Sequence, residues 1–283
     1  MADDRPWARP LDQILEIERV GEDTFGARLD GFGAVTLGCA TLAAARTCPE
    51  RFLHSLHMYF LRPVVPEQRV ELAVERVRDG RRFAHRRVRV QADGRLLGEL
   101  VASFAAPGGG VEYQDAAPDP ATPAPDDLPT EEDLARAEGW DPDGPGPLGG
   151  PLEWRWIGVP WQDVSPETPS RYRAWVRPRF PLRDDPALRA AALAFLCDYH
   201  SHFPVARKLG GHFEPAGYTS LDQALWIHRD VPWDDWWLLV SESDVGHAGR
   251  AFSRRLLHAR DGRLVASMAQ EQLVPRVPSD APA

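Results

Sequence analysis

The stretch DDPALRAAALAFLCDYH, residues 184–200, predicts the helix around which the rest of the chain is organised. Pro186 suits a first helical turn, and Asp184 or Asp185 can cap the free amides of that turn. After Pro186 the only charged side chain before the far end of the stretch is Arg189, so the helix is apolar on nearly every side. We therefore expect a helix of roughly 14 residues, about 20 Å long, that is enclosed by a sheet.

Asp198 ends this stretch in a position that needs an explanation. It follows Phe195 by three residues and Ala191 by seven, and therefore lies on their apolar face. A carboxylate at a helix C-terminus opposes the helix dipole, and beside an apolar stripe it also loses water. Either the chain has reached the surface and Asp198 is solvated, or Asp198 has a chemical role, and this stretch alone leaves both readings open.

Composition sets the broad class of the protein. The chain has 283 residues, 43% of them hydrophobic, with 10 Trp and 11 Phe, which is enough for two ordinary domains with sizeable cores. A net charge of -9 argues against a nucleic-acid partner. There is no apolar signal segment at the start and no run of roughly 18 apolar residues. We expect a soluble cytoplasmic protein without a nucleic-acid or membrane partner.

The order of elements occurs twice along the chain. A second, mostly apolar helix is predicted from Gly33 to Thr47, and four alternating strand-like segments follow it up to residue 105, as an antiparallel meander. After residue 150 two strand-like segments, the helix of residues 186–198, an irregular segment at 200–217 and four more alternating segments repeat this order. The fold class is therefore α+β, with one helix and one curled antiparallel sheet in each half.

Residue matches support a tandem duplication. The segment GRRFAHRRVRVQADGR from Gly80 aligns with GRAFSRRLLHARDGR from Gly249. Three aligned pairs, Phe83 with Phe252, Asp93 with Asp261 and Arg62 with Arg229, give offsets of 169, 168 and 167. Such consistent offsets indicate one ancestral unit copied once.

A Pro-, Gly-, Asp- and Ala-rich region separates the two copies. We expect domains at residues 1–110 and 150–283, joined by a linker at 111–149 that contains one brief helix opened by a capping box from Thr130 to Asp133. An unpaired sheet edge is an aggregation hazard. The two halves are therefore expected to pair side by side into one continuous sheet.

The strand segments resemble those of a known family. HSLHMYFLRPV with VERVRDGRRFAHRRV, and later TSLDQALWIHR with GRLVASMAQE, are similar to segments of the acyl-CoA thioesterase II family, in which one chain carries two fused hotdog domains. The resemblance implies a tandem double hotdog, with each sheet wrapped around one helix, that hydrolyses acyl-CoA. The family commonly has Gly-Gly-Gln at the start of its first helix, where this chain has Gly33-Ala34-Val35.

The same resemblance implies the residues that activate water. They are Asp198 at the end of the second helix, Ser220 two residues before Asp222, and Gln270 in the last strand. A carboxylate, a hydroxyl and a carboxamide can together hold one water by hydrogen bonds, and a thioester is electrophilic enough to need no cofactor. Gln270 aligns with Ala102 at an offset of 168 (270 − 102), so the chemistry is expected in the second half only.

Competing readings have less support. Asp198, His200 and His202, with His212 nearby, suggest a metal site, but His-x-His outside a regular element is more often a solvated loop. The sequence lacks the GxSxG and P-loop patterns and the compact Asp and His motif of hotdog hydratases. A module that binds acyl thioesters without hydrolysing them would share the fold and pocket and stays open, as do acyl chain length and further assembly into homo-oligomers.

Overall fold

The fold is described from a computed structural model of the chain, in which the structure describes residues 9–141, 150–158, 164, 167–210, 217–230 and 233–274. The first half contains α1 (Leu11–Ile14), β1 (Ile17–Arg19), β2 (Thr24–Leu29), α2 (Gly33–Arg46), β3 (Phe52–Phe60), β4 (Gln68–Asp79), β5 (Phe83–Ala92) and β6 (Arg95–Ala105). Between the halves lie a 3-10 turn, η1 (Pro125–Asp127), and α3 (Glu131–Ala137). The second half contains β7 (Leu152–Ile157), β8 (Tyr172–Pro178), α4 (Pro186–Asp198), α5 (Phe203–Lys208), β9 (Thr219–Ile227), β10 (Trp237–His247), β11 (Arg250–Ala259) and β12 (Leu264–Leu273).

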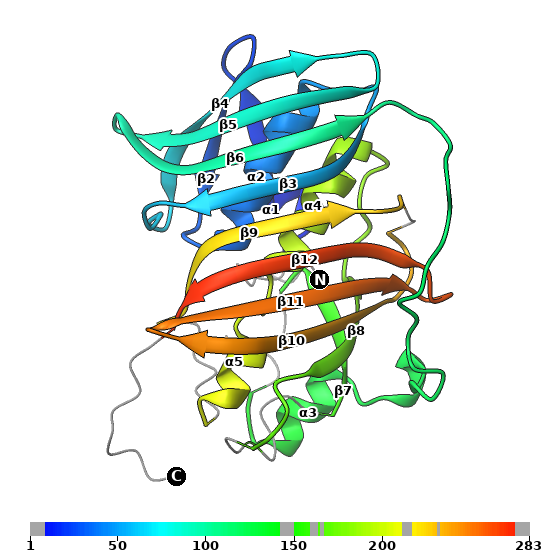
Figure 1. Ribbon diagram of the computed structural model, residues 1–283. Coiled ribbons are helices and arrows are strands. Elements are labelled where there is room, and N and C mark those ends of the chain that lie inside the picture. The colour runs from blue at the N-terminus through cyan, green and yellow to red at the C-terminus, as the bar shows by residue number, and fades with distance from the viewer. Residues whose placement is uncertain are drawn as a thin grey trace.

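One antiparallel sheet runs through both halves. Its 12 strands lie in the order β1-β2-β4-β5-β6-β3-β9-β12-β11-β10-β8-β7, and Figure 1 shows the first half stacked above the second. The halves join where β3 pairs with β9, from Ser55 opposite Trp226 to Tyr59 opposite Asp222. The predicted continuous sheet is therefore confirmed.

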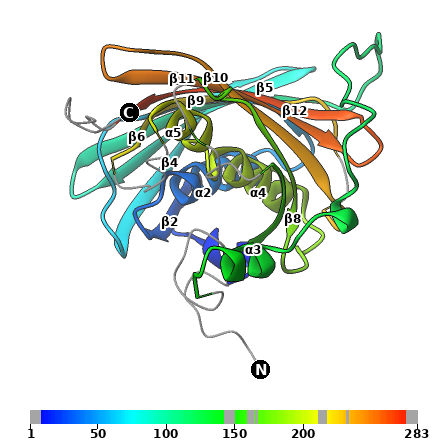
Figure 2. The ribbon, with the colours of Figure 1, turned by 90° about the horizontal axis from the view of Figure 1, so that it is seen from below.

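The two long helices lie inside the curve of this sheet. Figure 2 shows α2 and α4 side by side with the strands curling around them. Almost every residue of α2 is buried, and α4 is buried from Leu188 to its end apart from two partly exposed residues. The predicted α+β double arrangement, one helix wrapped by each half-sheet, is confirmed, and none of the helices among the described residues is long and apolar enough to cross a membrane.

The predicted meander is correct for three strands of each half and wrong for the first. β4, β5 and β6 are successive neighbours, joined at the last turn by Asp93 and Gly94, both with positive φ. β3, however, pairs with β6 and not with β4. The connection from β3 to β4 spans residues 61–67 and contains Pro63 and Pro66, so it does not form a tight hairpin. The alternation of apolar and polar residues identified the strands, but it does not indicate the order in which they lie in the sheet.

Equivalent hydrogen bonds in the two halves support the duplication. The side chain of Arg62 donates to the Leu96 carbonyl, and that of Arg229 donates to the Leu264 carbonyl. In the core, one buried arginine in each half donates hydrogen bonds to carbonyls at the C-terminal end of the central helix. Arg86 donates to the Thr47 carbonyl beyond α2, and Arg255 donates to the carbonyls of Cys197 and Tyr199 at the end of α4. Arg86 and Arg255 are 169 residues apart (255 − 86), the offset of the aligned phenylalanines.

The region between the halves packs on the second half. Thr130 and Asp133 form the predicted capping box at the start of α3. Before it, Trp175 donates to the Pro123 carbonyl, and Gln114 exchanges hydrogen bonds with the turn between β11 and β12. This part of the connection is therefore bound to the C-terminal strands along its length, while residues 142–149 of the predicted linker lie outside the described residues.

Candidate active site

Asp198 is the last residue of helix α4 and lies at its C-terminal end. Asp185 caps the helix by accepting from the amides of Ala187 and Leu188, and Pro186 occupies the first turn. The apolar stretch that follows is enclosed by the sheet, so the last helical residue is enclosed with it. Asp198 is only 4% exposed. The reading in which the chain surfaces and Asp198 is solvated is wrong.

The three residues expected from the sequence come together in the structure. The Gln270 carboxamide donates from Nε2 to Asp198 Oδ1 and to Ser220 Oγ, each at 2.8 Å. Ser220 Oγ donates to the same carboxylate oxygen at 3.4 Å. Gln270 is 1% exposed, and its Oε1 has no hydrogen-bond partner among the residues that the structure describes. The hydrogen bonds from protein side chains thus converge on one oxygen of Asp198.

A β-bulge turns Ser220 toward Asp198. On β9 the buried side chains are Gln223, Leu225 and Ile227, so regular alternation would direct Ser220 to the outer face with Asp222. The register shifts here, because Asp222 lies opposite Glu271 while Ser220 lies opposite Gln272 and Leu221 is extra. One inserted residue reverses the facing of the strand beyond it, and this is why Ser220 reaches the interior.

Burial sets the ionisation of Asp198. Desolvation raises the pKa of its carboxyl to about 6, against the opposing effects of the Arg255 charge and of the hydrogen bonds from Gln270 and Ser220. A carboxyl with this pKa is ionised at neutral pH, yet is more basic than an exposed aspartate. Those are the properties of a group that accepts a proton from water.

The raised pKa predicts that Asp198→Asn stabilises the fold at neutral and alkaline pH. Because the folded pKa of about 6 exceeds the unfolded value of 3.8, ionising Asp198 opposes folding, and the cost appears as the pH rises from about 4 to 6. The variant should have a higher free energy of unfolding than the wild type by roughly 1 to 3 kcal/mol at pH 8, and an equal one near pH 4. Denaturant unfolding at several pH values measures this.

Asp184→Asn is the matched control, because this carboxylate at the other end of the same helix is 99% exposed. Its removal should change the free energy of unfolding by less than about 0.5 kcal/mol at either pH. An Asp198→Asn variant that is no more stable than the wild type at pH 8 would contradict the burial argument.

The start of α2, from the other half, forms the opposite wall of the site. A side chain on Gly33 would begin 3.1 Å from Asp198 Oδ2, so glycine leaves open the space next to this second carboxylate oxygen. The first amides of a helix have no partner within the helix and lie at the positive end of its dipole. Ala34 and Val35, by contrast, are buried in the core. Although this chain lacks the family's Gly-Gly-Gln, it has a glycine, Gly33, at the position next to the Asp198 carboxylate.

A cavity of about 460 Å³ opens in front of these groups. Its lining combines polar residues near Asp198 with apolar side chains from the loops after β3 and before β9. The lining residues include Phe32, Gly33, Thr36, Phe60, Leu61, Val64, Asp198, His202, Tyr218, Ser220 and Gln272. The site can therefore hold an apolar group with its reacting end near Asp198.

The histidines after α4 are not in a solvated loop, contrary to expectation. His200 is 8% exposed and stacks on Phe203, with ring centroids 4.4 Å apart, and burial lowers the pKa of its imidazole. His202 is 7% exposed. The segment predicted to be irregular also contains a short helix, α5, which begins at Phe203 with Pro204 in its first turn. Aromatic side chains enclose His200. The His-x-His spacing in the sequence could not indicate this, because two of these side chains, Trp154 and Trp156, come from a distant strand.

The described part of the chain contains no cluster of three or more His, Cys, Asp or Glu side chains able to hold a metal ion. His212 of the alternative metal reading lies outside the described residues. The three cysteines, Cys39, Cys48 and Cys197, are free and buried, and therefore pack as small hydrophobic residues.

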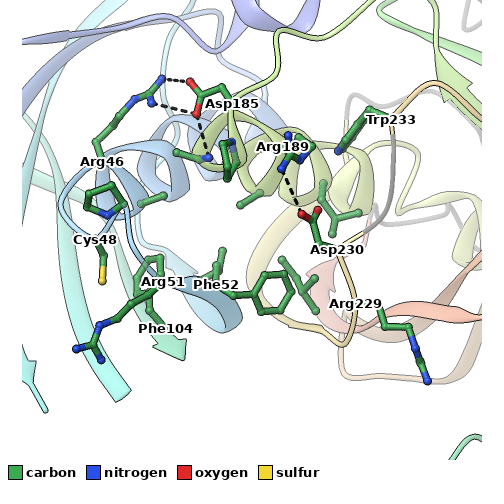
Figure 3. A pocket seen from close by; sticks show the side chains of 18 of the residues that line it. Arg46, Cys48, Arg51, Phe52, Phe104, Asp185, Arg189, Arg229, Asp230 and Trp233 are labelled. Atoms are coloured by element: carbon green, nitrogen blue, oxygen red, sulfur yellow. Dashed lines mark hydrogen bonds and ion pairs between the residues drawn. The ribbon is translucent and has the colours of Figure 1, made fainter. Parts of the chain in front are cut away.

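The opposite end of the helix pair contains the counterpart of this site, with different side chains. A pocket of about 140 Å³ lies there, and Figure 3 shows Arg46 paired to Asp185 and Arg189 paired to Asp230 in it. At the offsets of 167 or 168, the positions of Ser220, Gln270 and Gln272 are occupied by Leu53, Ala102 and Phe104. Pro186 has no amide hydrogen, and Asp185 already caps the amides after it. The strand positions that carry Ser220, Gln270 and Gln272 at one end therefore carry apolar residues at the other.

Comparison with known proteins agrees with this geometry. Residues 27–105 match the family model for the acyl-CoA thioesterase N-terminal domain, and residues 119–274 match the model for its C-terminal domain. The chain belongs to the acyl-CoA thioesterase family. The thioesterase is 27% identical to acyl-CoA thioesterase 2 of Haemophilus influenzae, over 93% of this chain and 96% of the relative. It is also 27% identical to acyl-coenzyme A thioesterase 8 of Mus musculus, over 92% of this chain and 87% of the relative.

Solved structures give the same family and name the fold. The crystal structure of an acyl-CoA thioesterase II from Mycobacterium marinum is 31% identical, with a TM-score of 0.75, over 96% of this thioesterase and 100% of that chain. A protein with a hotdog fold from Alicyclobacillus acidocaldarius is 21% identical, with a TM-score of 0.74, and covers 96% of this chain. The expected double hotdog is thereby confirmed, while the domain boundaries at 110 and 150 stay predictions.

Two residues of the site were missed by sequence reasoning. Arg255 lies behind Asp198 and acts on its charge, and Gly33 faces it from the other half. The duplication contained a signal for the first, because Arg86 and Arg255 align. No sequence signal placed the start of α2 against the end of α4, since that contact depends on how the two halves pack.

Proposed function

We propose that this thioesterase hydrolyses acyl-CoA to a free carboxylic acid and CoA by direct attack of a water molecule oriented by Asp198, Ser220 and Gln270. The observation that supports this most is the buried Asp198 carboxylate, fixed at Oδ1 by two neutral side chains and facing the space next to Gly33 with Oδ2. The site needs no cofactor for this chemistry, since thioesters react directly with water when a base is present.

The proposed reaction divides the work among the three side chains. Asp198 accepts a proton from the water as its oxygen attacks the thioester carbonyl. Gln270 and Ser220 hold the carboxylate by hydrogen bonds to Oδ1, which directs Oδ2 toward the water. The carbonyl oxygen becomes negatively charged, the C–S bond then breaks as the carbonyl re-forms, and the CoA thiolate leaves and takes up the proton that Asp198 accepted.

Helix α2 supplies a place for the negative charge. Gly33 is its first residue and lies next to Asp198, so the amides at the very start of the helix, before those of Val35 and Thr36 that donate to the Phe32 carbonyl, are near the position of the attacked carbonyl. Preorganised amide donors stabilise a developing oxyanion without reorganisation. The acid and base side chains would then come from the second half and the oxyanion donors from the first, which makes the pairing of the halves necessary for activity.

A thiol-release assay over a panel of acyl-CoA chain lengths tests the function. We expect enzyme-dependent release of free CoA thiol from at least one substrate, with kcat in the ordinary range of about 1 to 10³ per second. The contrary result is acyl-CoA that binds in titration and is recovered intact after prolonged incubation for every chain length. That result would identify a binding module.

We also propose a role in fatty acyl-CoA metabolism, because apolar side chains such as Phe32, Phe60 and Val64 line the cavity. The cytoplasmic location and the formation of homo-oligomers stay predictions from the sequence. Acyl chain length follows from the same substrate panel.

A further inference from the structure

The bulge that places Ser220 is held by a side chain that the reaction does not use. Asp222 lies on β9 two residues after Ser220, and its carboxylate accepts from the Glu271 amide through Oδ1 at 2.9 Å. Glu271 is the residue between Gln270 and Gln272, opposite the bulge. The bulge interrupts the backbone hydrogen bonds between β9 and β12, and the Asp222 side chain accepts from the Glu271 amide at this interruption.

The other oxygen of Asp222 reaches across to the first half. His57 on β3 donates from Nε2 to Asp222 Oδ2 at 3.0 Å. The Asp222 side chain is 25% exposed and lies on the outer face of the sheet, away from the cavity. One carboxylate thus ties the bulged strand to β12, beside Gln270, and to β3 of the other half.

The first half has the same bulge without this carboxylate. On β3, Leu53 lies opposite Phe104 and Ser55 lies opposite Ser103, so His54 is the extra residue. These positions correspond to those on β9 at an offset of 167, and Ser55 is therefore the counterpart of Asp222 (222 − 55). A bulge can form here with serine in this position. The carboxylate is present in the second half, where Ser220 precedes the bulge. In the first half the residue that precedes the bulge is the apolar Leu53, and no carboxylate follows it in β3.

We infer that Asp222 is a positioning residue of the active site, which fixes the bulge so that Ser220 and Gln270 keep their hydrogen bonds to Asp198. This inference rests on the proposed function of those three residues. Asp222 touches neither substrate nor Asp198 and acts through the backbone of β9 and β12. His57 extends the same restraint to the interface between the halves.

Asp222→Ser tests the inference, because it introduces the residue that the first half already tolerates at this bulge. We expect kcat to fall about 10- to 100-fold with KM changed less than about twofold, since small misplacements of catalytic groups lower the rate of the chemical step. Asp222→Asn can still accept from the Glu271 amide and should retain kcat within about threefold of the wild type. Ser55→Ala is the matched control in the first half and should leave kcat within about twofold of wild type.

A double substitution separates positioning from a general loss of stability. In a Ser220→Ala background, Asp222→Ser should lower kcat by less than about threefold, because its main target is already absent. A loss of kcat in the single variant below twofold, or an undiminished loss in the Ser220→Ala background, would overturn the inference.

A readout independent of turnover keeps this test separate from that of the proposed function. The pKa of Asp198, followed by carboxylate carbon NMR, should rise in Asp222→Ser and stay unchanged in Asp222→Asn, because loosened hydrogen bonds from Gln270 and Ser220 no longer favour the ionised form. If the wild type releases no thiol but this pKa rises as stated, the proposed function fails and the positioning role stands. An unchanged Asp198 pKa in Asp222→Ser overturns the positioning role in either case.

Discussion

Asp198→Asn is expected to lower kcat for a good acyl-CoA substrate by about 10²- to 10⁴-fold at pH 8, the usual size of a general-base effect. The substitution keeps the shape of the side chain and its ability to accept from Gln270, and removes the proton acceptor. The wild-type rate should rise with pH through about 6, where the buried carboxyl ionises, and the variant should lack this rise. Thiol release measured from pH 5 to 9 gives both results.

Ser220→Ala and Gln270→Ala should each have smaller effects. Each removes a neutral donor from the Asp198 carboxylate, and a hydrogen bond to a charged group is worth about 1.5 to 3 kcal/mol. Because Gln270 acts through the Asp198 carboxylate that it holds, the combined substitution at 198 and 270 should cost less than the product of the single losses. Ala102→Gly, at the position equivalent to Gln270, is the control and should leave turnover nearly unchanged.

A folded Asp198→Asn protein with turnover within about twofold of wild type would show that the mechanism is wrong.

Arg255→Met is expected to destabilise the fold by roughly 3 to 5 kcal/mol, because it strips donors from several buried acceptors at once. Arg255 is 2% exposed and donates to the carbonyls of Cys197 and Tyr199 and to the hydroxyls of Ser241 and Tyr172. Its charge also lowers the pKa of Asp198, so its loss should move the pH profile of kcat to higher pH. Denaturant unfolding and pH-dependent thiol release measure the two effects.

The duplicated chain supplies the control for this prediction. Arg86→Met removes the equivalent arginine, which is 1% exposed and donates to Thr47 at the end of α2, so the loss of stability should be similar. No candidate active-site carboxylate lies at that helix end, and the pH profile of kcat should therefore not move. Arg255→Lys, which keeps the charge, should retain the profile while losing part of the stability. Equal shifts of the profile in the Arg255→Met and Arg86→Met proteins would refute a specific role for Arg255.

Much of the site was predictable because its residues are tied to local patterns. Asp198 was singled out as a carboxylate at the end of an apolar helix, whereas Gln270 came from the family resemblance, and its alignment with Ala102 indicated that the chemistry lies in the second half only. Ser220 came from resemblance alone, since regular alternation on β9 would direct it outward. The bulge at Leu221 that reverses it is a property of the pairing between β9 and β12.

Short-range sequence patterns were enough to predict the two central helices, most of the strands and the duplication. Helix periodicity, a capping Asp185 before Pro186 and strand alternation are short-range properties, and two copies of one unit repeat them at a nearly constant offset. Tertiary structure alone decided that β3 joins β6 to β9, that Gly33 of one half faces Asp198 of the other, and that His200 is enclosed by aromatic rings. These contacts join residues far apart in the chain, and their energies depend on packing and burial in the assembled sheet, which no local pattern encodes.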